Sequence, residues 1–153
     1  RRFLGCDIVM PSTQAQKAEC FAIGVDTSGS IGGAILGRFL GEIKSVCDEV
    51  MPEKVELMYW DSRVAGHETY EHGAVALLTD STKPRGGGGT DPDCVPVFMA
   101  EKHIKPQCLI MLTDGEFYKH DTSAWANLGV PVLWCVVGKK DFVPKVGQTV
   151  CVE

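Results

Sequence analysis

The chain has 153 residues, the usual length of a single domain with one hydrophobic core. Hydrophobic residues make up 44% and charged residues 23%, a composition that excludes a disordered chain. The formal net charge of -5, with the basic residues scattered, argues against a nucleic-acid-binding protein, and no apolar run approaches the roughly 20 residues that span a bilayer.

Residues 1–19 contain one apolar stretch followed by a polar linker. We interpret them as a lead-in segment or the end of an upstream region, and residues 20–153 as the domain proper. The chain opens with Arg1-Arg2 and not with Met, so we expect it to be a piece of a longer protein. It does not open with the charged and then apolar pattern of a secretion signal.

An apolar strand begins at Phe21, ends at Asp26 and is followed by hydroxyl residues at every second position. A short apolar run bounded by turn-forming residues is typical of a strand buried on both faces of a parallel sheet. Side chains alternate along an extended backbone, so we expect Asp26, Ser28 and Ser30 to converge while the residues between them point away. Three oxygen-bearing side chains would then face one point.

The remaining chain alternates between helical and extended patterns. Residues 32–51 carry apolar side chains at spacings of three and four and stop before Pro52, which predicts an amphipathic helix. Asp91 can cap another helix whose first residue is Pro92. From such patterns we expect helices at 32–51, 92–104 and 123–128, and strands at 21–26, 55–60, 64–70, 108–114, 130–137 and 146–152.

Strands that alternate with helices imply an α/β fold with an open, mostly parallel, Rossmann-like sheet and helices on both faces. Ligands of such sheets bind outside the carboxyl ends of the strands, where Asp26 and Asp114 fall. Thr90 follows four glycines, residues 86–89, whose backbone can approach an ion closely. Carboxylate and hydroxyl oxygens suit Mg²⁺ or Mn²⁺. We therefore predict a metal site formed by Asp26, Ser28 and Ser30, with residues 86–91 and 109–115 as the stretches that complete it.

The order of these motifs resembles the metal-ion-dependent adhesion site of von Willebrand factor type A (VWA) domains. That site has Asp-x-Ser-x-Ser, then a Thr after a glycine-rich loop, then Thr-Asp-Gly after a buried strand. All five positions match, and the likeness covers about residues 20–153. It implies a VWA sheet and a metal-dependent protein-interaction module that is not itself an enzyme. Ser28, Ser30 and Thr90 would offer neutral oxygens, while Asp26 and Asp114 would supply charge directly or through bound water.

Within that superfamily the chain is similar to a bacterial and phage branch in which the domain follows a metallopeptidase-like region and is encoded near MoxR-type AAA+ ATPases. The shared features are the amino-acid sequence of residues 25–31, the four-glycine loop and the Met10-Pro11-Ser12 segment before the first strand. The resemblance implies a MoxR-type ATPase as partner. Because the expected ligands leave a divalent ion with net positive character, we expect an Asp or Glu side chain of a partner protein to complete its coordination.

Several stretches of the sequence resemble enzyme motifs in part but lack a residue that the motif requires. Residues 26–29 carry an inserted Ser relative to the Asp-Thr-Gly of aspartic proteases, and residues 86–89 are not followed by the Lys of a phosphate-binding loop. Ser30 has Ser28, and not the Gly of a nucleophile elbow, two positions before it, and His67 lacks a second His at the zincin spacing. Two alternatives stay open: a hydrolase that acts on phosphate esters with the same metal, and a degenerate site without metal.

The seven cysteines are widely spaced, and an odd number cannot pair completely. Most lie in apolar runs, which predicts reduced core thiols in a cytoplasmic protein, with a structural zinc site as the second interpretation. Cys20 lies six residues before Asp26, and Cys108 six before Asp114. If both strands are parallel neighbours that end at one metal, these two thiols lie side by side and are buried.

Outside the predicted metal site we interpret Asp61 and Asp91 as solvated rim, turn or capping residues. The tryptophans are expected to be core residues rather than ligand platforms: Trp60, Trp125 and Trp134.

Overall fold

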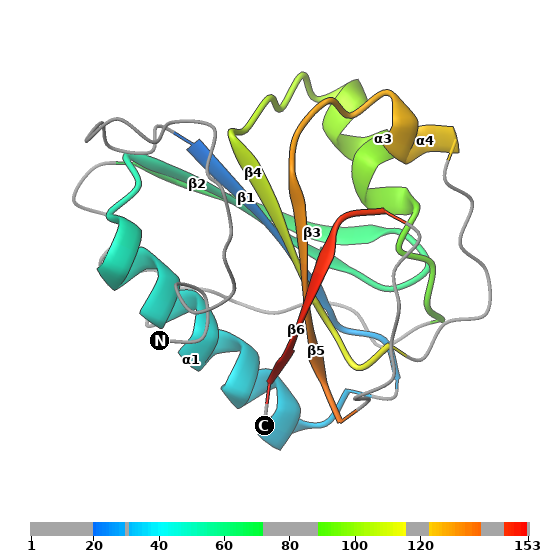
Figure 1. Cartoon of the computed structure of the whole chain (residues 1–153). Coiled ribbons are helices and arrows are strands. Elements are labelled where there is room, and N and C mark those ends of the chain that lie inside the picture. Colours follow the sequence, from blue (N-terminus) through cyan, green and yellow to red (C-terminus); the bar gives the residue numbers. More distant parts are fainter. Residues whose placement is uncertain (1–19, 30, 72–88, 116–122, 139–145, 153) are drawn as a thin grey trace.

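The computed structural model describes residues 20–29, 31–71, 89–115, 123–138 and 146–152, so the lead-in segment lies outside the described residues. A sheet lies between helices in a layered α/β arrangement (Figure 1). The elements in chain order are β1 (Cys20–Asp26), α1 (Gly33–Val50), β2 (Lys54–Trp60), β3 (Val64–Glu71), α3 (Cys94–Glu101), β4 (Cys108–Thr113), α4 (Ser123–Ala126), β5 (Val132–Val137) and β6 (Gln148–Val152).

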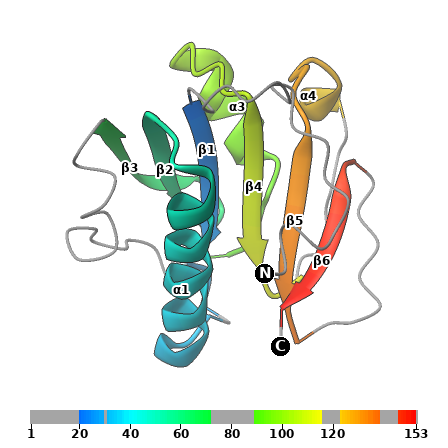
Figure 2. The same ribbon diagram turned by 60° about the vertical axis from the view of Figure 1, so that its left-hand side comes forward.

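The sheet has six strands in the order β3-β2-β1-β4-β5-β6. Only the β2–β3 pair is antiparallel, and the other four pairs are parallel. Helix α1 covers one face, whereas α3 and α4 lie on the other (Figure 2). The predicted open, mostly parallel sheet with helices on both faces is therefore confirmed. Because β1 pairs with β2 on one side and with β4 on the other, the strand order reverses there, and such a switch point is where open sheets bind ligands.

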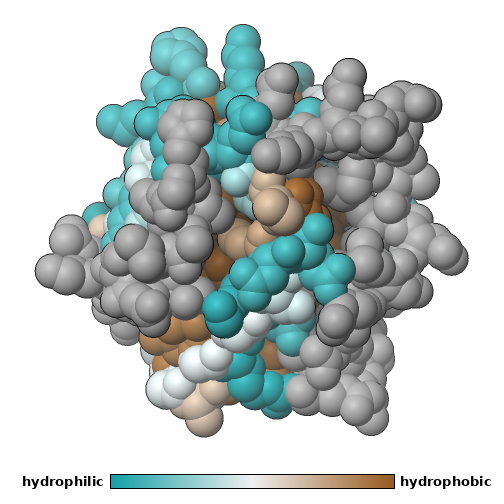
Figure 3. Space-filling view, turned by 90° about the vertical axis from the view of Figure 1, so that its left-hand side faces the viewer, coloured by the Kyte–Doolittle hydropathy of each residue, from teal (hydrophilic) through white to brown (hydrophobic). Residues whose placement is uncertain are grey.

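Helix α1 is amphipathic, as its apolar spacing predicts. Phe39, Ile43 and Val46 are buried against the sheet, while hydrophilic and near-neutral residues form a diagonal band across the outer face that carries the helix (Figure 3). The helix ends at Val50 and is capped by Met51, which is left-handed with φ 53° and donates its backbone N–H to the Cys47 carbonyl over 2.9 Å. Among the described helices, none has the length and apolar character needed to cross a membrane.

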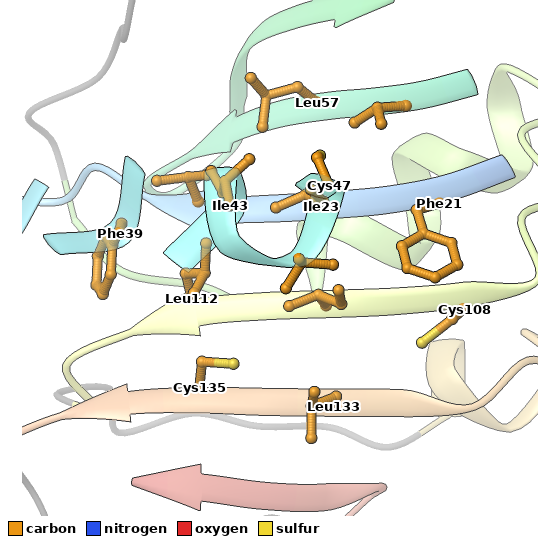
Figure 4. Close-up of a cluster of buried hydrophobic side chains, with 14 of the residues drawn as sticks. Phe21, Ile23, Phe39, Ile43, Cys47, Leu57, Cys108, Leu112, Leu133 and Cys135 are labelled. Atoms are coloured by element: carbon orange, nitrogen blue, oxygen red, sulfur yellow. The ribbon is translucent and has the colours of Figure 1, made fainter. Parts of the chain in front are cut away.

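The hydrophobic core has two layers, one on each face of the sheet. In the α1 layer, side chains from four strands meet the helix, among them Phe21, Leu57, Leu112 and Leu133 (Figure 4). The other layer lies under α3 and α4. It contains the three tryptophans, all 3% exposed or less, which confirms them as core residues. Burial on both faces explains why the central strands are continuous apolar runs.

The start of α3 differs from the prediction by two residues. The Asp91 side chain accepts the backbone N–H of Asp93 over 3.0 Å and so closes a turn before the helix, which begins at Cys94 and not at Pro92. Asp93 stands at the cap position but makes no capping bond. Its carboxylate accepts the indole N–H of Trp125 instead, over 2.7 Å, and this bond ties α3 to α4.

The predicted pairing of Cys20 with Cys108 is wrong by one residue, although β1 and β4 are parallel neighbours as expected. Cys108 lies opposite Phe21, beside which it is seen in Figure 4. The reason is that Asp26 is the last residue of β1, whereas Asp114 follows the end of β4. Cys108 is buried with Phe21, while Cys20 alternates to the other face and is only half-buried. The free thiols include Cys20, Cys47, Cys94, Cys108 and Cys135.

Candidate metal centre

Asp26 is the centre of the candidate site. It ends β1, and its side chain is fully buried. Oδ1 accepts the backbone N–H of Ser28 over 2.8 Å, and Oδ2 accepts the hydroxyl of Thr113 over 2.7 Å. Both carboxylate oxygens are therefore oriented, one by the turn that follows β1 and the other by the neighbouring strand β4.

The surroundings of Asp26 disfavour its charged form. Burial raises the pKa of the carboxyl above its ordinary value, and the charge of Asp114 raises it as well, although hydrogen bonds from Ser28 and Thr113 lower it in part. Asp114 is itself buried, with 9% of its surface exposed. Two buried carboxylates that repel one another form a donor set that a divalent cation would suit, because its charge would offset both the burial and the repulsion.

Thr27 and Ser28, in the turn after β1, bond to different partners. The backbone N–H and the hydroxyl of Thr27 both donate to the Trp60 carbonyl, over 2.8 and 3.2 Å, so this residue is tied to the end of β2. Ser28 is 2% exposed, and its backbone N–H donates to Asp26 Oδ1. Ser30, the third residue of the predicted trio, lies outside the described residues.

Thr90 stands in the loop just before α3 and is half-buried. The following residue, Asp91, donates its backbone N–H to the Asp61 carbonyl over 2.8 Å. Asp61 directly follows β2 and closes a tight turn, since its side chain accepts the backbone N–H of Arg63 over 3.0 Å. Because the end of β2 is also bonded to Thr27, the loop that carries Thr90 is fixed at the same edge of the sheet as Asp26. Of the four loop glycines, residues 86–88 lie outside the described residues.

Asp114 follows the end of β4, where the chain turns sharply. Gly115 has φ +78°, a conformation that glycine adopts without strain, and its N–H donates to the Thr113 hydroxyl over 3.1 Å. The carboxyl-terminal ends of β1, β2 and β4 thus bring Asp26, Ser28 and Asp114 together and hold Thr90 at the same edge.

Among the described residues, no three His, Cys, Asp or Glu side chains gather as a metal site. The predicted ligand set does not require such a group, since it contains two carboxylates and otherwise hydroxyl oxygens. Those donors fit a hard cation such as Mg²⁺ better than a soft one.

Two residues at this edge were missed or misread from the sequence. Thr113 was not considered, because it shares a face with Asp26 only in the observed register, which differs by one residue from the predicted one. Asp61 was interpreted as solvated, but only 7% of its surface is exposed. Its role in a turn was predicted correctly, and its burial follows from the loop that is bonded over it.

Comparisons with known proteins agree with the fold. The model of the family described as "VWA-like domain (DUF2201)" matches residues 21–153. The crystal structure of the ArnB paralog VWA2 from Sulfolobus acidocaldarius is similar with a TM-score of 0.58 and 14% identity, over 81% of this chain and 36% of that chain. The chain therefore spans well under two thirds of that protein.

The crystal structure of the SpRpn10 VWA domain is similar with a TM-score of 0.53 and 14% identity, over 88% of both chains. At such low identity these two likenesses establish the fold alone. A search of curated protein sequences found no match.

Proposed function

The chain belongs to the VWA-like domain family (DUF2201), and from that premise we propose that it is a non-catalytic protein-interaction module whose binding depends on Mg²⁺ or Mn²⁺. The observation that carries the proposal is the pair of buried aspartates, Asp26 and Asp114, at the ends of adjacent strands β1 and β4. A buried pair of like charges is unfavourable by itself, and an ion bound at this edge of the sheet would relieve it.

The five residues predicted from the sequence would hold this ion. Ser28, Ser30 and Thr90 would offer neutral oxygens, and Asp26 and Asp114 would supply charge directly or through water, since Mg²⁺ keeps several of its waters. When bound, the ion would act as a Lewis acid toward an oxygen of the partner. The chain's own contribution is to orient these oxygens and keep the two carboxylates in place.

We infer that the group completing the coordination is an Asp or Glu side chain of a partner protein. Three neutral oxygens and two partly screened carboxylates leave a divalent ion with net positive character. Helix α1 begins shortly after Ser30 and adds to the attraction. Its first turn contains no acidic residue and Gly32 provides no capping side chain, so the positive end of the helix dipole is not neutralised there.

For the partner we propose a MoxR-type AAA+ ATPase in the cytoplasm of a bacterium or in a phage-infected cell. This part rests on the resemblance of residues 25–31 and of the four-glycine loop to one branch of the superfamily. It needs a partner with at least one exposed acid at its docking surface.

The test is a pull-down of a MoxR-type ATPase from the same organism, in Mg²⁺ and in excess chelator. We expect retention in Mg²⁺, loss in chelator, and loss for D26A and T90A. The matched controls are D48A, which removes an exposed aspartate, and T69A, which removes a threonine far from the site. Both should bind like the parent.

Binding that is unchanged in chelator would contradict the metal dependence. Affinity that survives replacement of each exposed acid of the ATPase in turn would contradict the carboxylate docking. Turnover of simple phosphate esters that disappears in D26A would instead favour a metal-dependent hydrolase.

A further inference from the structure

The hydroxyl of Thr113 makes two hydrogen bonds that join the two halves of the candidate metal centre. It donates to Asp26 Oδ2 over 2.7 Å and accepts the backbone N–H of Gly115 over 3.1 Å. Thr113 is fully buried, so water does not readily replace either bond. One side chain of β4 therefore contacts the aspartate of β1 and the turn that carries Asp114.

The direction of these bonds is fixed by chemistry. A backbone N–H can only donate, so the Thr113 oxygen must accept from Gly115, and the single proton of the hydroxyl remains for Asp26. The other oxygen of Asp26 accepts the N–H of Ser28 over 2.8 Å. The Asp26 carboxylate is thus held from opposite sides, by its own turn and by β4, and cannot rotate without breaking a buried hydrogen bond.

The bond from Gly115 spans Asp114 and forms a short turn closed by the threonine side chain. Gly115 is left-handed, with φ +78°, so the backbone bends at the residue directly after Asp114. The Thr113 hydroxyl therefore fixes the backbone that presents Asp114, in the same way as it fixes the side chain of Asp26.

We propose that Thr113 is a positioning residue of the metal centre, whose hydroxyl sets the spacing of Asp26 and Asp114 and thereby selects Mg²⁺ over the larger Ca²⁺. The inference rests on the function proposed above. Mg²⁺ requires near-octahedral oxygens at a short distance, whereas Ca²⁺ accepts six to eight oxygens in flexible arrangements. Loosening the two aspartates should harm the binding of Mg²⁺ much more than that of Ca²⁺.

The test is the affinity of the purified domain for Mg²⁺ alone and for Ca²⁺ alone, measured by isothermal titration calorimetry. Removing a group that orients a metal ligand costs about 10- to 100-fold in affinity. We therefore expect T113V, which keeps the shape but loses the hydroxyl, to raise the Mg²⁺ Kd at least about tenfold and the Ca²⁺ Kd by less than about threefold. T113S, which keeps the hydroxyl, should restore the parent ratio.

The matched control is T69V. Thr69 also donates its hydroxyl to a buried carboxylate, Glu56 Oε1, over 2.6 Å, but it lies on β3 away from the site. T69V should leave both metal affinities unchanged. A general loss of stability would lower the affinity for both ions alike. The ratio of the Mg²⁺ and Ca²⁺ affinities therefore separates a positioning role of Thr113 from a merely structural one.

Each outcome either supports or contradicts the positioning role of Thr113. A parent that binds neither ion overturns the proposed function and this inference with it. A parent that prefers Mg²⁺ and a T113V variant with the same preference overturn the inference alone. If T113V does not fold, the pair T113S and T113A, which differ by one hydroxyl, replaces it at low temperature. Equal Mg²⁺ to Ca²⁺ ratios in that pair would refute the role of the hydroxyl, and a selective loss in T113A would support it.

Discussion

Gly24 and Met111 face one another across β1 and β4 with no space for a side chain. A β-carbon on Gly24 would lie 2.7 Å from Met111 Sδ and 3.4 Å from the indole of Trp60. Met111 and Trp60 are both fully buried. Gly24 precedes Asp26 by two residues, so both lie on the same face of β1.

Replacing Gly24 by alanine should destabilise the domain, because the added methyl overpacks a filled region. We expect G24A to lower the free energy of unfolding by about 1–3 kcal/mol in urea titrations. Shortening Met111 should make room, so the double variant G24A/M111A should lose less than the sum of the two single variants.

The control is G41A. Gly41 lies on the exposed side of α1, where an added β-carbon would meet no atom within 4 Å. This variant should stabilise the domain by up to about 1 kcal/mol, since alanine favours the helix. A G24A protein as stable as the parent would show that Met111 can move aside at no cost.

Much of the fold was predictable from local patterns. The apolar runs of β1 and β4 predict strands buried on both faces, and the positions of Asp26 and Asp114 after them predict which edge of the sheet carries the site. The register between these strands was not predictable, because it depends on where each strand leaves the sheet. β1 ends at Asp26 itself, while β4 ends one residue before Asp114.

The chemistry of the candidate site was predictable from residue types but not its internal hydrogen bonds. Nothing local indicates that Thr113 donates to Asp26, since this bond joins residues 87 positions apart. The hydrogen bonds of Asp91 were not predictable either. The following Pro92 indicated a helix cap, but the Asp91 side chain accepts the backbone N–H of Asp93, and the Asp93 side chain accepts the indole N–H of Trp125. Such competition is decided by tertiary contacts.

Met51 ends α1 in the left-handed conformation, with φ 53°, and 60% of its surface is exposed. A side chain costs roughly 1–2 kcal/mol in this conformation, and glycine avoids that cost. We therefore expect M51G to raise the free energy of unfolding by about 1 kcal/mol, with little loss of packing. M51A, which keeps the β-carbon, is the control and should not stabilise. Equal effects of both variants would indicate that the strain is relieved in solution.

Glu56 gives the domain a stability that depends on pH. Burial raises the pKa of its carboxyl, but hydrogen bonds from Thr69, His67 and Lys54 prevail and lower the pKa below the ordinary value. Because the pKa of Glu56 is lower in the folded state, its ionised carboxylate stabilises the fold fully above the unfolded pKa, about 4.5. This stabilisation is lost as the pH falls through the folded pKa. The difference in unfolding free energy between the parent and E56Q should therefore shrink as the pH falls below about 4.5.

Urea titrations between neutral and acidic pH measure this difference. D48N is the control, because Asp48 and Lys44 form an exposed ion pair at 3.6 Å with side chains 65% and 62% exposed. Removing such a pair should change the stability by less than about 1 kcal/mol at every pH. A difference for E56Q that does not vary with pH would mean that Glu56 stabilises the fold through neutral contacts alone.

Asp26 should affect stability in the opposite direction. Burial and the charge of Asp114 raise its pKa, so its ionisation weakens the metal-free fold, and this penalty is complete above the folded pKa. As the pH falls toward the unfolded value, about 3.8, the penalty disappears. In chelator at pH 7 we expect D26N to be at least as stable as the parent, because the neutral amide does not carry the buried charge.

With metal the order should reverse. A ligand that binds only the folded state at 100 times its Kd adds about 2.7 kcal/mol. In Mg²⁺ the free energy of unfolding of the parent should rise by this amount. That of D26N should not rise, because the variant lacks the Asp26 carboxylate that would bind the ion. D48N should respond to Mg²⁺ like the parent. If D26N is strongly destabilised in chelator and the parent ignores Mg²⁺, then Asp26 is a structural hydrogen-bond acceptor for Thr113 and Ser28, and the edge of the sheet binds no ion.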